Sequence, residues 1–540
     1  MSLQKFTLKR IWSALSSRQI ALSFAVALIL LVFLSACYSN NSSSTSTGVT
    51  CPLATGNYSN ASLPNGSQWA YQLSGFAVLN GTSYSPYATA GTFTVDGKGN
   101  ITAGFDDFLG GNFTGNYSVT NNGTGTISVV LNSGSNSGVA LSWAMTLDNT
   151  SPGSIYVIEA DPTFNSSGVA YQQTSTALGA VPSGTFVFHT HVLASGTGLS
   201  GSSATVGVMT VNAGTIASLN DDVVLAGVST QRTLGTGTSA FGTPDTTGRG
   251  SVSITDSQSV TSTFDYFVID ANHYLLFETD ATGGGLGLGR MEAQTAPAGG
   301  FTTATLSGGY VFGSRGDTAA SAATGVNSVG QFSVDGAGNV KAGSYDTVRD
   351  GSATVGAAIT ASGSSYAVQS NGRMAVTLSA SGTPVGLTAY MVSGTRGFFL
   401  VNNDVNRVED GTLEQQSAAS FSGSDFKGQS AFVMGGAISG SAGAPIDRTG
   451  TVNSDGNGNL GWAEVVNSGG SINTPGCLSG TYTVATNGRV ATSVTSLSAN
   501  LVFYMVSPTK AYMLQGDSQT EVLGGATMQA SPVLDPPGAF

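Results

Sequence analysis

Alternating apolar and polar residues recur at regular intervals along the chain. The runs Thr92-Phe93-Thr94-Val95 and Gln331-Phe332-Ser333-Val334 both alternate, and a period of two indicates a strand with one buried face. A turn of the form Asp-Gly-x-Gly-Asn occupies 96–100, 335–339 and 455–459, with a degraded copy at 212–215. The four turns start 116, 123 and 120 residues apart. This repetition predicts an array of four small domains rather than one large fold.

Each repeat shows the same succession of predicted strands. An aromatic strand comes first, then a hairpin around the Asp-Gly-x-Gly-Asn turn, a second hairpin, and a third, more apolar hairpin. That makes roughly eight strands with short turns, which predicts an all-β antiparallel meander. A last short strand closes each repeat and ends in a glutamine: Gln173, Gln294, Gln416 or Gln529.

Eight antiparallel strands can close into a barrel when the last strand pairs with the first. We therefore predict four tandem, eight-stranded, barrel-like domains. In size and strand count the unit is similar to the calycin barrels, the lipocalins and avidins, and this resemblance is one of architecture. The alternative is a β-sandwich of about seven strands, which would require long crossovers.

The third hairpin departs from simple alternation. Residues 264–269 read Phe-Asp-Tyr-Phe-Val-Ile, so both faces of this strand carry large apolar side chains. A barrel strand with one face in water should not have this pattern. We predict that neighbouring barrels pack against this face; the alternative is a separate partner.

The first 36 residues have the layout of a secretory signal. They contain four basic residues and no acidic one, and an apolar run at 20–34 follows. The run of about 15 residues is short for a membrane span of ~20. It ends in Leu34-Ser35-Ala36-Cys37, which resembles the lipobox of bacterial lipoproteins. The alternative is an uncleaved anchor with an incidental cysteine.

The lipobox resemblance implies that Cys37 is acylated and becomes the new N-terminus. It places the protein outside the cytoplasm, anchored to a membrane through its lipid. Residue 38 is Tyr rather than the Asp associated with inner-membrane retention, which favours the bacterial outer membrane or cell surface.

Composition supports a folded, turn-rich exported protein. Only 9% of residues are charged, 40% are apolar, and 75 of 540 are glycine, so disorder driven by charge is not expected. Without the signal, 14 basic residues face 30 acidic ones. A net acidic and sparsely charged surface excludes nucleic acid as an expected partner.

The repeats and the signal predict a domain organisation. The signal peptide spans 1–36, a flexible tether rich in Ser, Asn and Thr spans 37–62, and a tail spans 532–540. A repeat of ~120 residues is large enough to fold alone, so residues 300–418 expressed alone are predicted to give a soluble β-rich domain. The β repeats are predicted at 63–175, 176–299, 300–418 and 419–531.

The repeated turn permits a calcium hypothesis, because carboxylate and amide oxygens on a glycine loop suit a hard cation. Acidic residues also lie downstream of the turns, at Asp107, Asp222, Asp346 and Glu464. One turn, however, supplies only two side-chain ligands. We therefore interpret Asp96, Asp335 and Asp455 as turn residues that bond their own backbone.

Few other residues are candidates for chemistry. His189 and His191 share one face of a strand, a spacing that metals can use, and His273 is the one further histidine. They are weak metal candidates, and unrelated polar roles are the preferred interpretation. We expect no metal and no cofactor.

The sequence contains no Gly-x-Ser-x-Gly motif, and the nearest segment, at 198–202, lacks the second glycine. We therefore predict no catalytic residues. Arg249, Arg373 and Arg489 each follow a turn glycine and are predicted to form structural salt bridges with the repeated aspartates. With Cys37 assigned to lipid, Cys51 and Cys477 either pair or stay as free thiols, and free thiols are the simpler interpretation.

Together these features predict a lipid-anchored exported surface protein with a binding or structural role. Its expected partners are the membrane, through the lipid, and an unidentified surface protein or glycan. Two alternatives remain open: a carrier of small apolar ligands in the barrel interiors, and a hydrolase that acts on surface polymers.

Overall fold

The computed structural model describes residues 58–528 except for short gaps at 80–82, 149–152, 194–198, 281–285, 320–324, 381–382, 439–443, 495–496, 498–500 and 518–519. The predicted signal peptide, Cys37, most of the tether and the C-terminal tail lie outside the described residues. Within the described ranges, no helix has the length and apolar character needed to cross a membrane.

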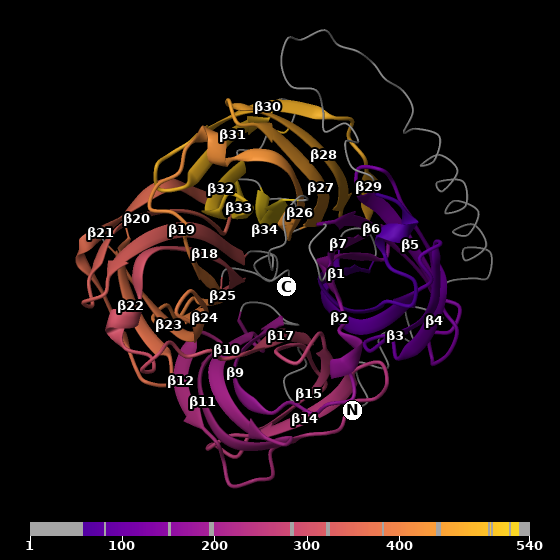
Figure 1. Cartoon of the computed structure of the whole chain (residues 1–540), viewed down its shortest axis with the longest axis horizontal. Coiled ribbons are helices and arrows are strands. Elements are labelled where there is room, and N and C mark those ends of the chain that lie inside the picture. Colours follow the sequence, from indigo (N-terminus) through magenta and orange to yellow (C-terminus); the bar gives the residue numbers. More distant parts are fainter. Residues whose placement is uncertain are drawn as a thin grey trace. The chain divides into compact units, whose positions relative to one another are not determined.

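Four successive antiparallel β-barrels account for nearly all of the described chain (Figure 1). The first consists of β1 (Gln68–Val78), β2 (Tyr84–Val95), β3 (Asn100–Asp106), β4 (Gly111–Val119), β5 (Thr124–Leu131), β6 (Ala140–Leu147), β7 (Ser154–Glu159) and β8 (Phe164–Gln172). The second consists of β9 (Gly184–Leu193), β10 (Ser203–Asn212), β11 (Thr215–Leu225), β12 (Val228–Thr233), β13 (Ala240–Phe241), β14 (Arg249–Thr255), β15 (Thr261–Val268), β16 (His273–Glu278) and β17 (Leu286–Ala293).

The third and fourth barrels repeat these two patterns. The third consists of β18 (Ser307–Thr318), β19 (Gly325–Asp335), β20 (Val340–Arg349), β21 (Ser352–Val368), β22 (Arg373–Ala380), β23 (Thr383–Ser393), β24 (Arg396–Val401) and β25 (Arg407–Gln415). The fourth consists of β26 (Lys427–Ile438), β27 (Ala444–Asp455), β28 (Asn459–Ser468), β29 (Ser471–Asn473), β30 (Leu478–Val484), β31 (Arg489–Val494), β32 (Leu501–Ser507), β33 (Lys510–Asp517) and β34 (Thr520–Met528).

Each barrel closes by pairing its first strand with its last. The pairs are β1 with β8, β9 with β17, β18 with β25, and β26 with β34, all antiparallel. In the second and fourth barrels a short ninth strand, β12 or β29, is added to the edge of the third strand. The predicted meander of eight-stranded barrels is confirmed, and the sandwich alternative is wrong.

A short 3-10 helix precedes each barrel: η2 (Asn60–Ser62), η3 (Ser175–Ala177), η4 (Thr303–Thr305) and η5 (Gly423–Asp425). In three barrels a tyrosine of the second hairpin holds this segment. The hydroxyls of Tyr117, Tyr366 and Tyr482 donate to backbone carbonyls of Asn60, Leu306 and Phe426, respectively, at 2.9–3.0 Å.

Side chains fill the barrel interiors. In the first barrel the Tyr71 ring lies 5.1 Å from the Trp143 ring, and Trp69 stacks on Phe93 at 6.3 Å. All four are buried in one cluster with aliphatic side chains from the other strands. Each of the other barrels has a core cluster of its own. The interior is thus a packed core, as expected for a barrel of eight strands.

The outward apolar residues of the third hairpins pack between barrels, as predicted. Phe267, Ile269 and Leu275 lie against Ala70 and Ala88 of the first barrel. Two further clusters join the second barrel to the third and the third to the fourth. A fourth cluster joins the fourth barrel back to the first, through Val433 and Tyr156 among others. Apolar contacts therefore connect every barrel to two others.

Candidate functional site

Three ion pairs repeat at the joints between successive barrels. Arg249, Arg373 and Arg489 each reach back to an outward-facing aspartate of the preceding barrel: Asp107 at 2.8 Å, Asp222 at 2.7 Å and Asp346 at 2.6 Å. Each arginine makes a two-point contact with its carboxylate, the strong geometry for this pair. Pairing of these arginines with the repeated aspartates is confirmed, and it occurs between barrels.

Glu464 does not belong to this set. It lies one position earlier in its strand than the paired aspartates, because it faces Gly450 across the ladder as Asp106 faces Gly91. Strand alternation therefore turns it into the fourth barrel, where Arg448 contacts it at 2.8 Å. Glu464 thus lies one residue out of register with Asp107, Asp222 and Asp346. A shift of one residue turns a side chain to the opposite face of a strand.

The glutamine that ends each repeat joins it to the next repeat. The side-chain amide of Gln173 donates to backbone carbonyls of Thr247 and Val268, that of Gln294 to Asn371 and Met391, and that of Gln416 to Asn487 and Met505, at 2.6–3.0 Å. Gln529 lies outside the described residues. The recurrence of glutamine was visible in the sequence, but its role was not, because its partners are backbone atoms about 75 to 95 residues away.

The joint between the fourth and first barrels has different chemistry. The position of the joint arginine holds Thr124 in the first repeat. Here Asn165 donates to Asp447, and the Asn467 amide donates to the carbonyls of Glu159 and Phe164 at 2.9 Å. In each of these contacts the donor is an uncharged side-chain amide. Hydrogen bonds and apolar packing therefore join the first and last repeats.

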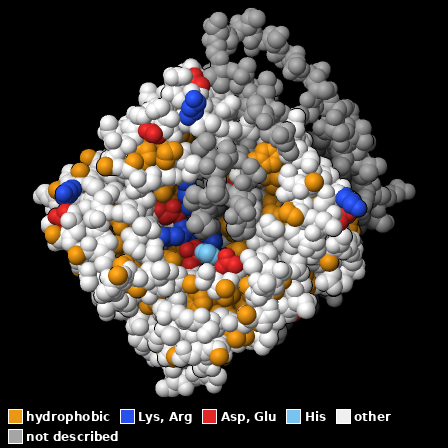
Figure 2. Space-filling view, in the orientation of Figure 1, with side chains coloured by type: hydrophobic (Ala, Val, Ile, Leu, Met, Phe, Trp, Pro, Cys, Tyr) orange, Lys and Arg blue, Asp and Glu red, His pale blue; other side chains and the backbone are white. Residues whose placement is uncertain are grey.

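A buried histidine–aspartate cluster lies where the second and third barrels meet. The outward side chains of β9, His189 and His191, both contact the carboxylate of Asp410 on β25, at 3.0 and 2.6 Å through their Nδ1 atoms. The other ring nitrogen of His191 lies 3.5 Å from Asp317, which also accepts a hydrogen bond from Ser202 at 2.5 Å. Figure 2 shows charged side chains gathered around a hollow in the middle of this face, while most of the surrounding surface is uncharged.

The electrostatics of this cluster favour a charged pair. Burial alone would lower the pKa of His191, but Asp410 and Asp317 raise it to about 9. Burial alone would raise the pKa of Asp410. The two histidines lower it by a larger amount, to about 2. Burial lowers the pKa of His189. His191 therefore carries a proton at neutral pH and forms an ion pair across the joint.

We expect the free energy of unfolding to fall as the pH rises from about 6.5 to 9. A histidine whose folded pKa is raised stabilises the fold fully below its unfolded pKa and loses that contribution as pH passes the folded value. Chemical denaturation between pH 6 and pH 10 measures this dependence. In His191→Gln this part of the dependence should be absent. A similar decline in the variant would contradict the assignment.

The cluster does not form a nucleophile and base. The hydroxyl of Ser202 donates to Asp317, and the free face of His191 meets the same carboxylate rather than a hydroxyl. His273 lies apart from it, at the start of β16, where it contacts Asp270 at 2.9 Å. Among the described residues, no three His, Cys, Asp or Glu side chains are arranged to hold a metal ion. The structure thus brings two of the three histidines together, with aspartates that the sequence did not single out.

The repeated turn aspartates bond to their own turns. Asp96 accepts from the backbone amides of Lys98 and Asn100 at 2.8 and 2.9 Å, and from the Asn100 side chain at 2.5 Å. Asp335 and Asp455 form the same three bonds. The glycines of the first turn have φ of +70° and +114°, which other residues rarely adopt. The interpretation as turn residues is confirmed.

Calcium is therefore expected to leave the melting temperature unchanged. The carboxylate oxygens of these turns already accept hydrogen bonds, and one turn offers too few further ligands. Differential scanning calorimetry with calcium and with EDTA checks this. A calcium-dependent rise that disappears in Asp335→Ala would show binding at the turn.

Cys477 is disulfide-bonded, so the preferred interpretation as a free thiol is wrong for this residue; Cys51 lies outside the described residues.

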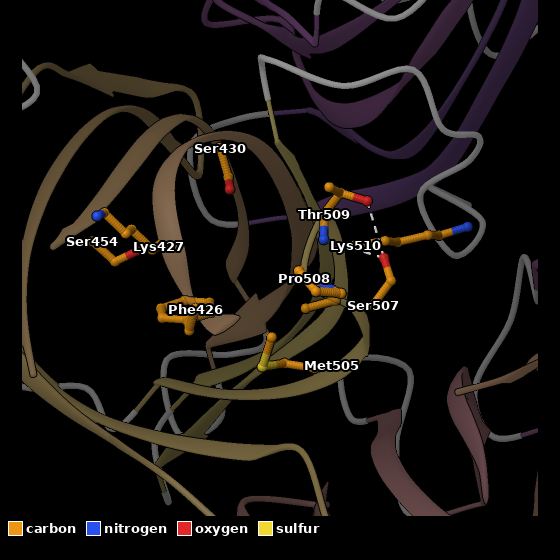
Figure 3. Close-up of a pocket in the computed structure, with 10 residues that line it drawn as sticks. Phe426, Lys427, Ser430, Ser454, Met505, Ser507, Pro508, Thr509 and Lys510 are labelled. Carbon is orange, nitrogen blue, oxygen red and sulfur yellow. Dashed lines mark hydrogen bonds between the residues drawn. The ribbon is translucent and has the colours of Figure 1, made fainter. Parts of the chain in front are cut away.

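A small recess beside the fourth barrel (Figure 3) has no His, Asp, Glu or Cys in its lining, and Lys510, which borders it, donates to Glu414 at 2.8 Å. The lining residues are Phe426, Lys427, Ser430, Ser454, Met505, Ser507, Pro508, Thr509, Lys510 and Ala511.

Comparison with known proteins gives structural matches only. No protein-family model matches the chain, and no curated protein matches its sequence. A protein of unknown function from Nostoc punctiforme, of the DUF3598 family, is 11% identical over 43% of this chain and 95% of its own, with a TM-score of 0.15. Isotype 1 transferrin binding protein B from serogroup B Neisseria meningitidis is 9% identical over 69% of this chain and 82% of its own, with a TM-score of 0.17. These values support no inference about what the present chain binds.

Proposed function

We propose that the chain is a lipid-anchored exported surface protein whose four barrels act as one unit in a binding or structural role. The observation that supports this most is the chemistry of the joints. The outward apolar hairpins, the arginine–aspartate pairs and the terminal glutamines all connect barrels to one another. Because these side chains hold the barrels together, the four barrels form one unit. The remaining loops of this unit can contact a partner.

The two alternatives receive less support from the geometry. A carrier of apolar ligands needs an unfilled interior, whereas aromatic and aliphatic side chains pack the interiors of all four barrels. A hydrolase needs a nucleophile within hydrogen-bond reach of a base. In the described part of the chain the best-placed base, His191, faces a carboxylate instead.

Lipid attachment at Cys37 is the first test of this proposal. In the producing bacterium, Cys37→Ser should abolish labelling by a radioactive or clickable fatty acid and release the protein from membranes or leave its signal uncut. Cys51→Ser is the matched control, because it removes a second cysteine 14 residues away in the tether, and it should label normally. Persistent labelling of Cys37→Ser would contradict the lipoprotein assignment.

Exposure at the cell surface is tested separately. On intact cells, added protease should degrade the anchored protein, whereas a periplasmic marker stays intact. Protection of the protein until the outer membrane is opened would place it on an inner face and contradict a surface role.

A further inference from the structure

The joint between the fourth and first barrels differs from the other three in its relation to the chain. The linkers 173–183, 294–306 and 416–426 lead from one barrel directly into the next, so each of those joints forms between neighbours along the chain. The first and fourth barrels are instead the two ends of the array, and their contacts complete a cycle of four joints. Bringing distant parts of a chain together costs more loop-closure entropy than bringing neighbours together.

The side-chain contacts at this closing joint are also of a weaker kind. The position of the joint arginine holds Thr124 in the first repeat, and Glu464 of the fourth repeat points into its own barrel. The side-chain amides of Asn165, Asn467 and Gln429 donate across the joint. Hydrogen bonds from neutral amides are weaker than the two-point arginine–carboxylate pairs of the other joints. The closing joint therefore gains most from an additional link.

Cys477 is disulfide-bonded and belongs to the part of the fourth barrel that faces this joint. It directly precedes β30, which pairs with β28. Strand β28 also carries Asn467, whose side-chain amide donates to backbone carbonyls of the first barrel at 2.9 Å. In the turn after β28, the backbone amide of Gly470 donates to Asn165 of the first barrel at 3.4 Å. A disulfide at Cys477 is thus placed to connect the two sides of the joint.

The sequence restricts the partner of Cys477 to two residues of the same chain. The three cysteines are Cys37, Cys51 and Cys477. Cys37 is the proposed lipid attachment site, and a sulfur that carries a lipid cannot form a disulfide, so this step rests on the proposed function. Cys51 remains. It lies outside the described residues, seven positions before Tyr58, and seven residues of chain span at most about 25 Å.

The first described residues lie close to the fourth barrel. Tyr58 packs against the core of the first barrel. The side-chain oxygen of Asn60 accepts from the backbone amide of Val119 at 2.8 Å. Three residues further along, the carbonyl of Asn122 accepts from Gln429 of the fourth barrel at 3.3 Å. The chain therefore enters the first barrel beside the joint that Cys477 flanks.

We propose that a disulfide between Cys51 and Cys477 links the segment before the first barrel to the fourth barrel and closes the cycle of barrels covalently. This goes beyond the proposed surface role, because it concerns how the two ends of the array are held together. When the sulfur–sulfur bond forms, the two thiols lose two protons and two electrons. Exchange with the disulfide of an oxidoreductase accepts the electrons and reduces that disulfide to two thiols. Disulfides persist in the compartments to which a secretory signal directs a chain.

The bond would act on this joint as the linkers act on the others. It makes the first and fourth barrels neighbours in the covalent structure, which removes much of the entropy cost of bringing them together. A cross-link between residues as far apart as 51 and 477 also restricts the unfolded chain strongly. Reduction is therefore expected to lower the stability of the folded protein.

Peptide mapping of the complete mature protein, extracted from membranes with its free thiols blocked, tests the pairing. Chymotrypsin cleaves after Tyr38 and Tyr58 and so separates Cys37 from Cys51. Mass spectrometry should find one linked pair of peptides, containing Cys51 and Cys477, that separates on reduction, and the non-reduced protein should migrate as a monomer. A bond from Cys477 to Cys37 or to a second copy, or free thiols at both positions, would overturn the proposal. The peptide with Cys37 shows in the same digest whether lipid is attached, so a failure of the anchor assignment is seen separately.

Thermal melting tests whether the bond holds the array closed. Cys51→Ser and Cys477→Ser should each lower the melting temperature by about 3 to 5 °C. The double variant should lose no more than either single variant, because all three lack the same bond. A phosphine reductant should lower the melting temperature of the unmodified protein by a similar amount and leave both variants, the matched controls, unchanged. Additive losses, an effect of the reductant on Cys51→Ser, or unchanged melting in every variant would overturn the proposal.

Discussion

Replacing Arg489 with methionine is expected to destabilise the protein by about 3 to 5 kcal/mol. The change leaves Asp346 as an uncompensated charge in a buried joint, and the loss of one partner of a buried pair has this magnitude. Asp346 is 0% exposed and also accepts from the hydroxyl of Tyr504 at 2.7 Å. Chemical denaturation followed by circular dichroism measures the change in the transition midpoint.

Two further variants distinguish the joint from a general effect of removing arginine. Arg349→Met removes a cation that is 34% exposed and pairs with Asp404 at 2.7 Å within the third barrel, so it should cost about 1 kcal/mol or less. Combining Arg489→Met with Asp346→Asn removes the uncompensated charge and should recover part of the loss. Equal destabilisation by Arg349→Met and Arg489→Met would contradict the importance of the joint.

Residues 300–418 expressed alone are expected to aggregate rather than melt cooperatively as a monomer. Isolation of the third barrel exposes Tyr390, Phe398 and Leu400, which pack on the second barrel, and Val311 and Val329, which pack on the fourth. Contiguous apolar patches of this kind promote association in water. This reverses the expectation from repeat length alone. Light scattering and thermal melting of the fragment and of the complete mature chain check it.

A redesigned fragment shows whether the joints are the cause. Substituting Phe398→Thr and Leu400→Thr changes only outward positions of β24 and leaves the interior cluster of the barrel intact. The redesigned fragment should be more soluble than the unmodified one. A monomeric, cooperatively melting fragment without any substitution would show that each barrel is independent and that the joints contribute little.

The sequence was sufficient to predict the fold of one repeat because local patterns specify it. Alternation in residues such as Phe93 and Val95 sets the buried face of a strand, and the Asp-Gly-x-Gly-Asn turns set the hairpins. The apolar third hairpin also indicated contact between repeats, because the large apolar side chains on both of its faces must be buried from water. All of these signals lie within a few residues of the structure they determine.

The joints were predicted only in part. The arginine recurs in the second to fourth repeats and the aspartate in the first to third, so their pairing could be suggested, but the sequence could not tell whether a pair forms within or between barrels. Glu464 was misplaced because one residue of register reverses the face. Asp410 and Asp317 gave no signal, since they are not repeated and lie about 125 to 220 residues from the histidines that they contact.

The sequence by itself thus determined the repeat, its eight strands, its turns and the faces that each strand buries, because these depend on periodicity and on local turn chemistry. Tertiary structure alone decided which barrel contacts which. It also placed the fourth barrel against the first through hydrogen bonds and apolar packing, and it buried the carboxyl groups of Asp106 and Glu159 in the first barrel. These properties depend on side chains that meet only after distant strands have closed and packed, and pairwise geometry of that kind leaves no periodic trace in the chain.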